Sequence, residues 1–157
     1  MASDAAFLVG MVALAADWRE GSDVRSAADV LAEPSLAHYA AGWPMAGDAG
    51  CVAEMADGTL IGAAWWRLFP SEDPGYGFVD AAVPEVAVAV VPEHRVEGVG
   101  SALMQQLIEL AVEEALPGLS LSVERDNEAL SIYQGLGFVE VGGSTTAATM
   151  LLRLGDA

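Results

Sequence analysis

A valine-rich segment followed by a glycine-bearing loop and an amphipathic stretch is the feature that most constrains the fold. The segment Glu85–Val91 is continuously apolar after its first residue, which is typical of a strand buried on both faces. The loop after it carries Gly98 and Gly100, and the pattern predicts a helix over Gly98–Ala115. Such a loop directs several backbone N–H groups at one point, where the helix dipole adds about half a positive charge. We therefore expect this segment to hold a phosphate or pyrophosphate.

The remaining patterns predict helices first and then mostly strands. The expected helices are Ala5–Ala16, Ser26–Ala32, Ser35–Ala41 and Asn127–Leu136, and the expected strands are Gly50–Met55, Thr59–Phe69, Leu119–Val123, Phe138–Val141 and Ala147–Leu154. In the first helix the periodicity favours a buried face of Phe7, Met11, Leu14 and Ala15. An Asp57-Gly58 pair predicts a hairpin turn. A strand, a helix and a strand over residues 85–123 imply a parallel pair. The fold class is therefore α/β, a mixed sheet with helices on both faces, in a single domain over residues 1–157.

Composition excludes several classes of partner. The chain has 157 residues, of which 54% are hydrophobic and 18% charged, and its net charge is −17 with six basic residues, all arginine. Such a charge argues against nucleic acid and anionic membranes as partners. No apolar run is long enough to span a bilayer, and the first charge is Asp4, so we expect no signal peptide and a cytoplasmic protein. The single cysteine, Cys51, excludes an intrachain disulfide, and no spacing suggests a metal site.

A dinucleotide-binding fold is one interpretation of the two glycines. That fingerprint requires a third small residue where Leu103 stands, and it places the glycines directly after the strand. Here Pro92–Glu97 intervene. Glu124, at the end of the next strand, does stand where a ribose-binding acid would be expected. The spacing as a whole nevertheless disfavours this fold.

Two motifs together resemble the GNAT superfamily of N-acetyltransferases. The first is Arg95-x-x-Gly98-x-Gly100, which resembles the acyl-CoA pyrophosphate loop, and the second runs from Asn127 to Tyr133 and on to Gly137-Phe138. The resemblance implies a central, mostly antiparallel sheet with a splayed parallel strand pair. It also implies acetyl-CoA as cosubstrate, a primary amine as acceptor, and direct transfer in a ternary complex.

The resemblance also implies the residues of the site. The implied cofactor contacts are Val90, Val91, Arg95, Val96, Glu97, Gly98, Val99, Gly100, Ser101, Asn127, Ala129 and Tyr133. The N–H groups near Val90 and Val91 would polarise the thioester carbonyl. Glu85 would be the general base, or else a solvent-facing acid at the strand end. Tyr133 would protonate the departing thiolate, or else be a packing aromatic.

The chain departs from the family pattern at three points. Val96 stands where glycine is frequent, and Glu97 stands where a basic residue is common, beside the expected pyrophosphate. These two residues favour an alternative function, a non-catalytic acyl-CoA-binding or regulatory module. Met1–Asp4 is too short for the strand that usually begins the family's sheet. The edge at Gly50–Met55 would then be exposed, which favours a homodimer that covers it or shares strands near the C-terminus.

Residues outside the two motifs could complete the site. Arg95 is the basic residue of its loop, and a phosphate contact or a surface ion pair would explain it. The long loop Pro70–Pro84 is of a length that favours a functional role. With Tyr76, Phe78 and one of two tryptophans, Trp65 or Trp66, it could line an acceptor pocket, because strand alternation turns the two tryptophans to opposite faces.

Overall fold

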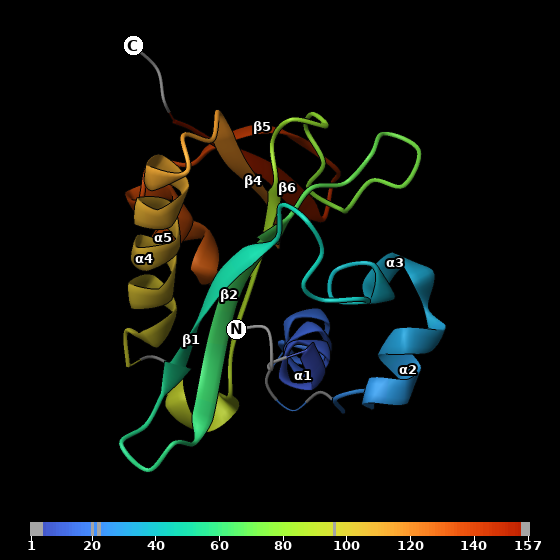
Figure 1. Cartoon of the computed structure of the whole chain (residues 1–157), viewed down its shortest axis with the longest axis vertical. Helices are drawn as coiled ribbons and strands as arrows, with labels where there is room; N and C mark the ends of the chain where they lie inside the picture. The colour runs from blue at the N-terminus through green and yellow to red at the C-terminus, as the bar shows by residue number, and fades with distance from the viewer. Residues whose placement is uncertain (1–4, 20, 22, 96, 155–157) are drawn as a thin grey trace. The chain divides into compact units, whose positions relative to one another are not determined.

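The computed structural model describes residues 5–19, 21, 23–95 and 97–154 (Figure 1). The helices are α1 (Ala5–Ala16), α2 (Ala27–Ala32), α3 (Pro34–Ala37), the 3-10 helix η2 (Pro92–His94), α4 (Val99–Glu113) and α5 (Ala129–Gly135). The strands are β1 (Ala49–Glu54), β2 (Leu60–Arg67), β3 (Glu85–Val90), β4 (Gly118–Glu124), β5 (Val139–Gly143) and β6 (Ala147–Arg153). The segment Met1–Asp4, which was expected to be too short for a strand, lies outside the described residues.

The strands form a mixed six-stranded sheet in the order β1-β2-β3-β4-β6-β5. β3 and β4 pair in parallel, with Glu85 opposite Ser120. β6 pairs antiparallel with both β4 and β5. These pairings confirm the expected fold class, an α/β mixed sheet that contains a parallel pair joined through a helix.

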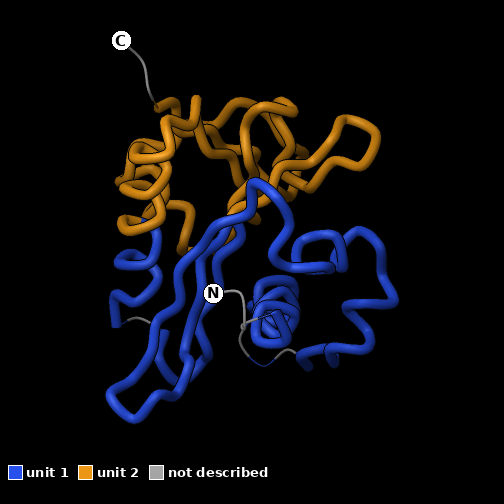
Figure 2. Tube along the Cα trace, viewed as in Figure 1, with its two compact units in different colours: residues 1–65, 87–104 blue, residues 66–86, 105–157 orange. Residues whose placement is uncertain are grey.

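The chain divides into two compact units (Figure 2). Unit 1 comprises residues 1–65 and 87–104, and unit 2 comprises residues 66–86 and 105–157. The boundary falls inside β2, β3 and α4. Each unit has its own buried side chains, and each is described below by itself.

In unit 1, α1 buries a different face from the predicted one. Its buried residues are Leu8, Val9, Met11, Val12 and Ala13. Of the expected face only Met11 is among them, so that prediction was wrong. Every residue of the helix is apolar or glycine, and a pattern without polar positions cannot indicate which face packs inward.

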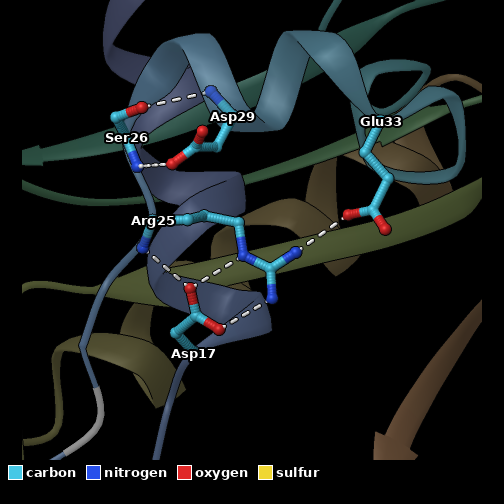
Figure 3. Close-up of polar contacts among 5 residues, drawn as sticks. All are labelled: Asp17, Arg25, Ser26, Asp29 and Glu33. Carbon is cyan, nitrogen blue, oxygen red and sulfur yellow. Dashed lines mark hydrogen bonds and ion pairs between the residues drawn. The ribbon is translucent and has the colours of Figure 1, made fainter.

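The start of α2 is fixed by a cluster of polar side chains (Figure 3). The Ser26 hydroxyl accepts the Asp29 N–H, and the Asp29 carboxylate accepts the Ser26 N–H, each at 3.1 Å. This capping box satisfies two backbone donors, so Ser26, which was expected to be the first residue of the helix, is its N-cap. Arg25, one residue earlier, binds both carboxylate oxygens of Asp17 at 2.9 Å and one oxygen of Glu33 at 2.9 Å. The ion pairs therefore link the end of α1 to the end of α2.

α3 is shorter than expected. It ends at Ala37 rather than Ala41. The N–H groups of Tyr39 and Ala40 donate three residues back, to Leu36 and Ala37, as in turns. Gly42 then takes a positive φ of 70°, which ends the helical path.

In unit 2 the part of α4 from residue 105 onward is amphipathic, as the sequence predicts. Leu107 and Ala111 are fully buried, whereas Glu109 and Glu113 are exposed. The closing strands differ in one detail from expectation. β5 continues through Gly142 and Gly143, beyond its expected end at Val141, and residues 144–146 make the turn into β6. All five residues of β5 are exposed, at the edge of the sheet.

Candidate functional site

The loop between β3 and α4 in unit 1 presents backbone donors. Gly98 has a φ of 83°, a conformation that glycine adopts without strain, and its carbonyl accepts the Ala102 N–H at 3.0 Å. The N–H groups of Val99, Gly100 and Ser101 are thus the first of the helix and have no acceptor within it. As the first N–H groups of a helix of fifteen residues, they lie at the positive end of a substantial dipole.

The side-chain positions of the two glycines are uncrowded. A Cβ atom added at Gly98 would meet nothing within 4 Å, and one at Gly100 would meet Val90 Cγ2 at 3.8 Å. A phosphate group can therefore approach the backbone here, so the residues present fit the pyrophosphate of an acyl-CoA. Val96, which was predicted to contribute, lies outside the described residues.

Arg95 holds the backbone around this loop. Its Nε donates to the Val90 carbonyl at 3.0 Å, and its Nη1 donates to the Trp18 carbonyl at 3.1 Å. These bonds use two of the five donors of the guanidinium and fix the end of β3 to the segment that follows α1. Neither expected role, a phosphate contact or a surface ion pair, accounts for these bonds. A phosphate contact through the other donors stays a prediction.

Glu97 is paired within the loop. Its Oε1 lies 3.0 Å from His94 Nδ1, and its side chain is 53% exposed. The pairing draws the carboxylate toward His94 but leaves a negative charge next to the helix start. This charge opposes an anionic ligand unless backbone donors outweigh it.

The end of β3 limits which N–H group can polarise a carbonyl. The Val91 N–H donates to the Ile61 carbonyl at 2.8 Å, so the expectation that it points at a ligand was wrong. The ladder with β2 extends one residue beyond the strand, and the sequence cannot show this because Ile61 is thirty positions away. Alternation turns the N–H of Val90 to the opposite edge of β3. Val90 is therefore the donor that stays a candidate.

In unit 2, Glu85 is buried at the first position of β3. Its side chain is 3% exposed, so the alternative of a solvent-facing acid was wrong. Its neighbour across the parallel pair is Ser120, which is fully buried. Ser120 and the buried Arg67 were not expected from the sequence, because their burial comes from strand pairing rather than from any local pattern.

Tyr133 lies on α5, also in unit 2. Its ring packs edge-on against Phe138, with centroids 6.1 Å apart, and the residue is 8% exposed. Burial raises the pKa of the phenol well above its ordinary value. The hydroxyl therefore keeps its proton throughout the neutral and mildly alkaline range, which is the form that a proton donor needs.

Asn127 and Ala129 fix the start of α5. The Asn127 Oδ1 accepts the Ala129 N–H at 2.9 Å, whereas Glu128, the residue directly before the helix, makes no side-chain cap. Both residues therefore have a structural role, and their predicted contacts with a cofactor stay predictions.

The long loop between β2 and β3 packs closely on β4. A Cβ atom at Gly77 would lie 2.4 Å from the backbone carbon of Leu121, so only glycine fits there. The neighbouring Tyr76 is 62% exposed. Trp65 and Trp66 are both buried, at 1% and 2% exposure, which makes each of them part of the core.

Two classes of site are absent from the part of the chain that the structure describes. No group of three or more His, Cys, Asp or Glu side chains there could hold a metal ion. None of the helices there combines the length and the apolar character needed to cross a membrane.

Comparison with known proteins identifies the family. A match to the acetyltransferase (GNAT) family covers residues 22–138. The chain belongs to the GNAT family. Mycothiol acetyltransferase from Paenarthrobacter aurescens (strain TC1) is 37% identical over 86 residues, which is 54% of this chain and 25% of that protein. The chain thus spans about a quarter of the length of that relative.

Two solved structures share the fold of this GNAT chain. The ribosomal-protein-S18-alanine N-acetyltransferase from Escherichia coli superposes with a TM-score of 0.68 at 18% identity, covering 100% of this chain and 92% of that one. The yncA protein from Salmonella typhimurium, solved with its cofactor acetyl-CoA, gives a TM-score of 0.67 at 20% identity, covering 100% and 91%. These likenesses confirm the fold that the two motifs predicted.

Proposed function

We propose that the chain transfers an acetyl group from acetyl-CoA to a primary amine, by direct transfer within a ternary complex. Membership of the GNAT family supports the reaction class. The single structural observation that carries the proposal is the open helix start of α4. There Gly98 and Gly100 leave the first N–H groups accessible to a pyrophosphate.

Acetyl-CoA would be held by the N–H groups of residues 96–101 and would supply a thioester as the acetyl donor. Two of the proposed roles concern charge. The N–H of Val90 stabilises negative charge on the thioester oxygen, as a preorganised backbone donor does. Glu85 accepts a proton from the substrate ammonium, which exposes the nitrogen lone pair.

Tyr133 is the proposed general acid. Because burial keeps its hydroxyl protonated, it can give that proton to the sulfur that leaves. Base and acid are then separate groups, so one accepts and the other donates a proton in a single turnover.

The acceptor is proposed at the level of a primary amine. An N-acetyltransferase that is named for alanine of a ribosomal protein shares the fold, and a relative is named for mycothiol. The exposed Tyr76, carried on the long loop, is the residue of this chain that we expect to contact the acceptor.

The assay for this proposal follows free thiol after the protein is mixed with acetyl-CoA and a panel of amines. We expect thiol release that depends on both the protein and one amine class. A rival function is a non-catalytic acyl-CoA-binding module, which the acidic Glu97 in the loop favours. Tight acetyl-CoA binding by calorimetry without thiol release from any amine would favour the module, and no binding would contradict both functions.

A further inference from the structure

Three polar side chains are buried in the part of the chain that the structure describes. Arg67, Glu85 and Ser120 are exposed by only 5%, 3% and 0%. They come from β2, β3 and β4, and all three belong to unit 2. Because polar groups are costly to bury unless they interact, three of them in one unit call for a common explanation.

The register of the parallel pair brings Glu85 and Ser120 together. The two residues are direct neighbours across β3 and β4, and the Ser120 N–H donates to the Pro84 carbonyl at 3.1 Å. Opposed residues on strands about 4.8 Å apart point to the same face of the sheet. The Ser120 hydroxyl is fully buried and has no hydrogen-bond partner among the described residues, so it stands beside the carboxylate with its donor unused.

The register of β2 against β3 brings Arg67 into the same row. Ile61 accepts the Val91 N–H, and a Cβ atom at Gly62 would lie 3.3 Å from Val90. The residue number on β2 rises from 61 to 62 as its partner's number falls from 91 to 90, which indicates antiparallel pairing. Both strands run on without a break. The same register, followed six residues along β2 from Ile61, sets Arg67 opposite the first residue of β3.

We propose that Arg67, Glu85 and Ser120 form one buried polar row across β2, β3 and β4, in which Arg67 and Ser120 are positioning residues for the Glu85 carboxylate. The inference rests on the proposed function, where Glu85 is the general base. Arg67 holds the carboxylate from one side by charge-assisted hydrogen bonds. Ser120 holds it from the other side through one bridging water, because its hydroxyl reaches no protein acceptor.

This arrangement would fix the direction of the base. A carboxylate that is held from both neighbouring strands loses its freedom to rotate, so its remaining lone pairs keep one orientation toward the amine. Orientation of this kind acts on turnover rather than on cofactor binding. Loss of either neighbour should therefore lower kcat and leave acetyl-CoA affinity unchanged.

The first test measures the coupling between Arg67 and Glu85 through protein stability, without an activity assay. Thermal unfolding is followed for Arg67→Met, Glu85→Gln and the double variant, and Arg125→Met, another arginine of unit 2, serves as the matched control. We expect Arg67→Met to lower the midpoint by several degrees more when Glu85 is present than in the Glu85→Gln background, whereas Arg125→Met acts equally in both. Additive effects of Arg67→Met and Glu85→Gln would overturn the row.

The second test measures steady-state kinetics and acetyl-CoA affinity. Arg67→Met and Ser120→Ala should each lower kcat about tenfold or more. Arg67→Lys should recover part of the loss seen in Arg67→Met. In the Glu85→Gln background, Arg67→Met and Ser120→Ala should not lower activity further. Ser122→Ala, two residues along the same face of β4, should stay close to wild type. Full turnover in Ser120→Ala and Arg67→Lys alike would overturn the positioning roles.

The two tests separate this inference from the proposed function. If Glu85→Gln keeps full activity while the unfolding midpoints remain coupled, the row stands and Glu85 is not the base. If Glu85→Gln loses activity while the midpoints are additive, the base stands and the row is wrong.

Discussion

At the scale of single residues, the phenol of Tyr133 gives a sharp prediction. Tyr133→Phe should lower turnover about 10²-fold, the usual size of the loss of a general acid, because it removes the proton and keeps the ring against Phe138. Acetyl-CoA affinity by calorimetry should be unchanged. Full activity in this variant would make Tyr133 a packing residue.

The pH dependence of turnover follows from the same side chain. Burial raises the pKa of Tyr133 above its ordinary value of 10.0, and a phenol is protonated below its pKa. The acid form should therefore persist beyond pH 10, so we expect no decline in kcat from this group as the pH rises to 10. A kcat profile that falls below pH 10 in wild type but is flat in Tyr133→Phe would contradict the raised pKa of this phenol.

Asp17 provides a prediction about stability. Hydrogen bonds from the Arg25 side chain, and then from its backbone, hold the pKa of this carboxyl below its ordinary value of 3.8. A lowered pKa contributes stability above that value, and the contribution is lost as the pH falls through the folded pKa. Asp17→Asn should cost about 0.5–1 kcal/mol at pH 7, since the pair is partly exposed. The difference from wild type should shrink below pH 3.8.

Denaturant unfolding at a series of pH values checks this prediction. Glu33→Gln is the control, because Glu33 binds the same guanidinium at a single contact and its side chain is 50% exposed. A stability difference for Asp17→Asn that stays constant down to pH 2 would show that the ion pair contributes nothing measurable.

What the sequence could predict about residues depended on spacing. The positions of Glu85 and Tyr133 relative to the glycines followed from motif resemblance, and Ser26 from its capping pattern. The burial of Glu85 and the hydrogen bond that occupies the Val91 N–H could not be predicted from the sequence, because both are created by strands remote in sequence. No local pattern indicates such an environment.

At the scale of elements, the start of α4 makes the two glycines distinguishable. Gly100 has room for a Cβ atom and lies inside a helix, so Gly100→Ala should raise helix stability by about 0.5–1 kcal/mol. Gly98 has a positive φ, so Gly98→Ala should cost about 1–2 kcal/mol.

Gly100→Val should weaken acetyl-CoA binding at least tenfold, because its branched side chain would cover the first N–H groups.

Calorimetry with acetyl-CoA, combined with thermal unfolding, measures these effects. Gly100→Ala is the control for Gly100→Val, since it tests the added carbon without the bulk. Wild-type affinity in a folded Gly100→Val protein would show that the pyrophosphate lies elsewhere.

Elements with a clear amphipathic or alternating pattern were predicted within one or two residues. α4 and β3 belong to this group, and so does the hairpin between β1 and β2. The predicted end of α3 was too late, since the residues after Ala37 form hydrogen-bonded turns rather than a further stretch of helix. The buried face of α1 was misassigned, since an all-apolar helix carries no directional signal.

At the scale of the whole molecule, the net charge of −17 determines a salt response. Backbone donors would hold the anionic ligand against a repulsive field, and Glu97 adds to that field. Moderate salt shortens the Debye length from about 30 Å at 0.01 M to about 8 Å at 0.15 M. Acetyl-CoA binding should therefore tighten, or not weaken, over this range.

A salt series of acetyl-CoA affinities tests this response. Glu97→Arg should bind more tightly and should weaken with salt, whereas Glu97→Gln should fall between it and wild type. A steep loss of wild-type affinity with salt would mean that arginine side chains dominate the phosphate site.

The edges of the sheet predict the assembly. β1 and β5 are edge strands, and β5 exposes Val139 and Val141 by 50% and 44%. Exposed edges of this kind are commonly covered or paired, so we predict a homodimer. Light scattering over a concentration series should give twice the chain mass of 16.2 kDa, and Val141→Arg should reduce it if β5 is the contact. A monomer mass at every concentration would contradict the dimer.

The unit boundary that passes through β2, β3 and α4 has a consequence for how the chain acquires its structure. Neither unit is one continuous stretch of sequence, so neither can be produced as a fragment by cutting the chain once. The pairing of Glu85 with Ser120 also joins residues separated by the whole of α4. Contacts between such distant positions slow folding, because a long loop must close before they form. Synthesis of the first half of the chain therefore leaves both units incomplete, because unit 1 needs residues up to 104 and unit 2 needs residues up to 157.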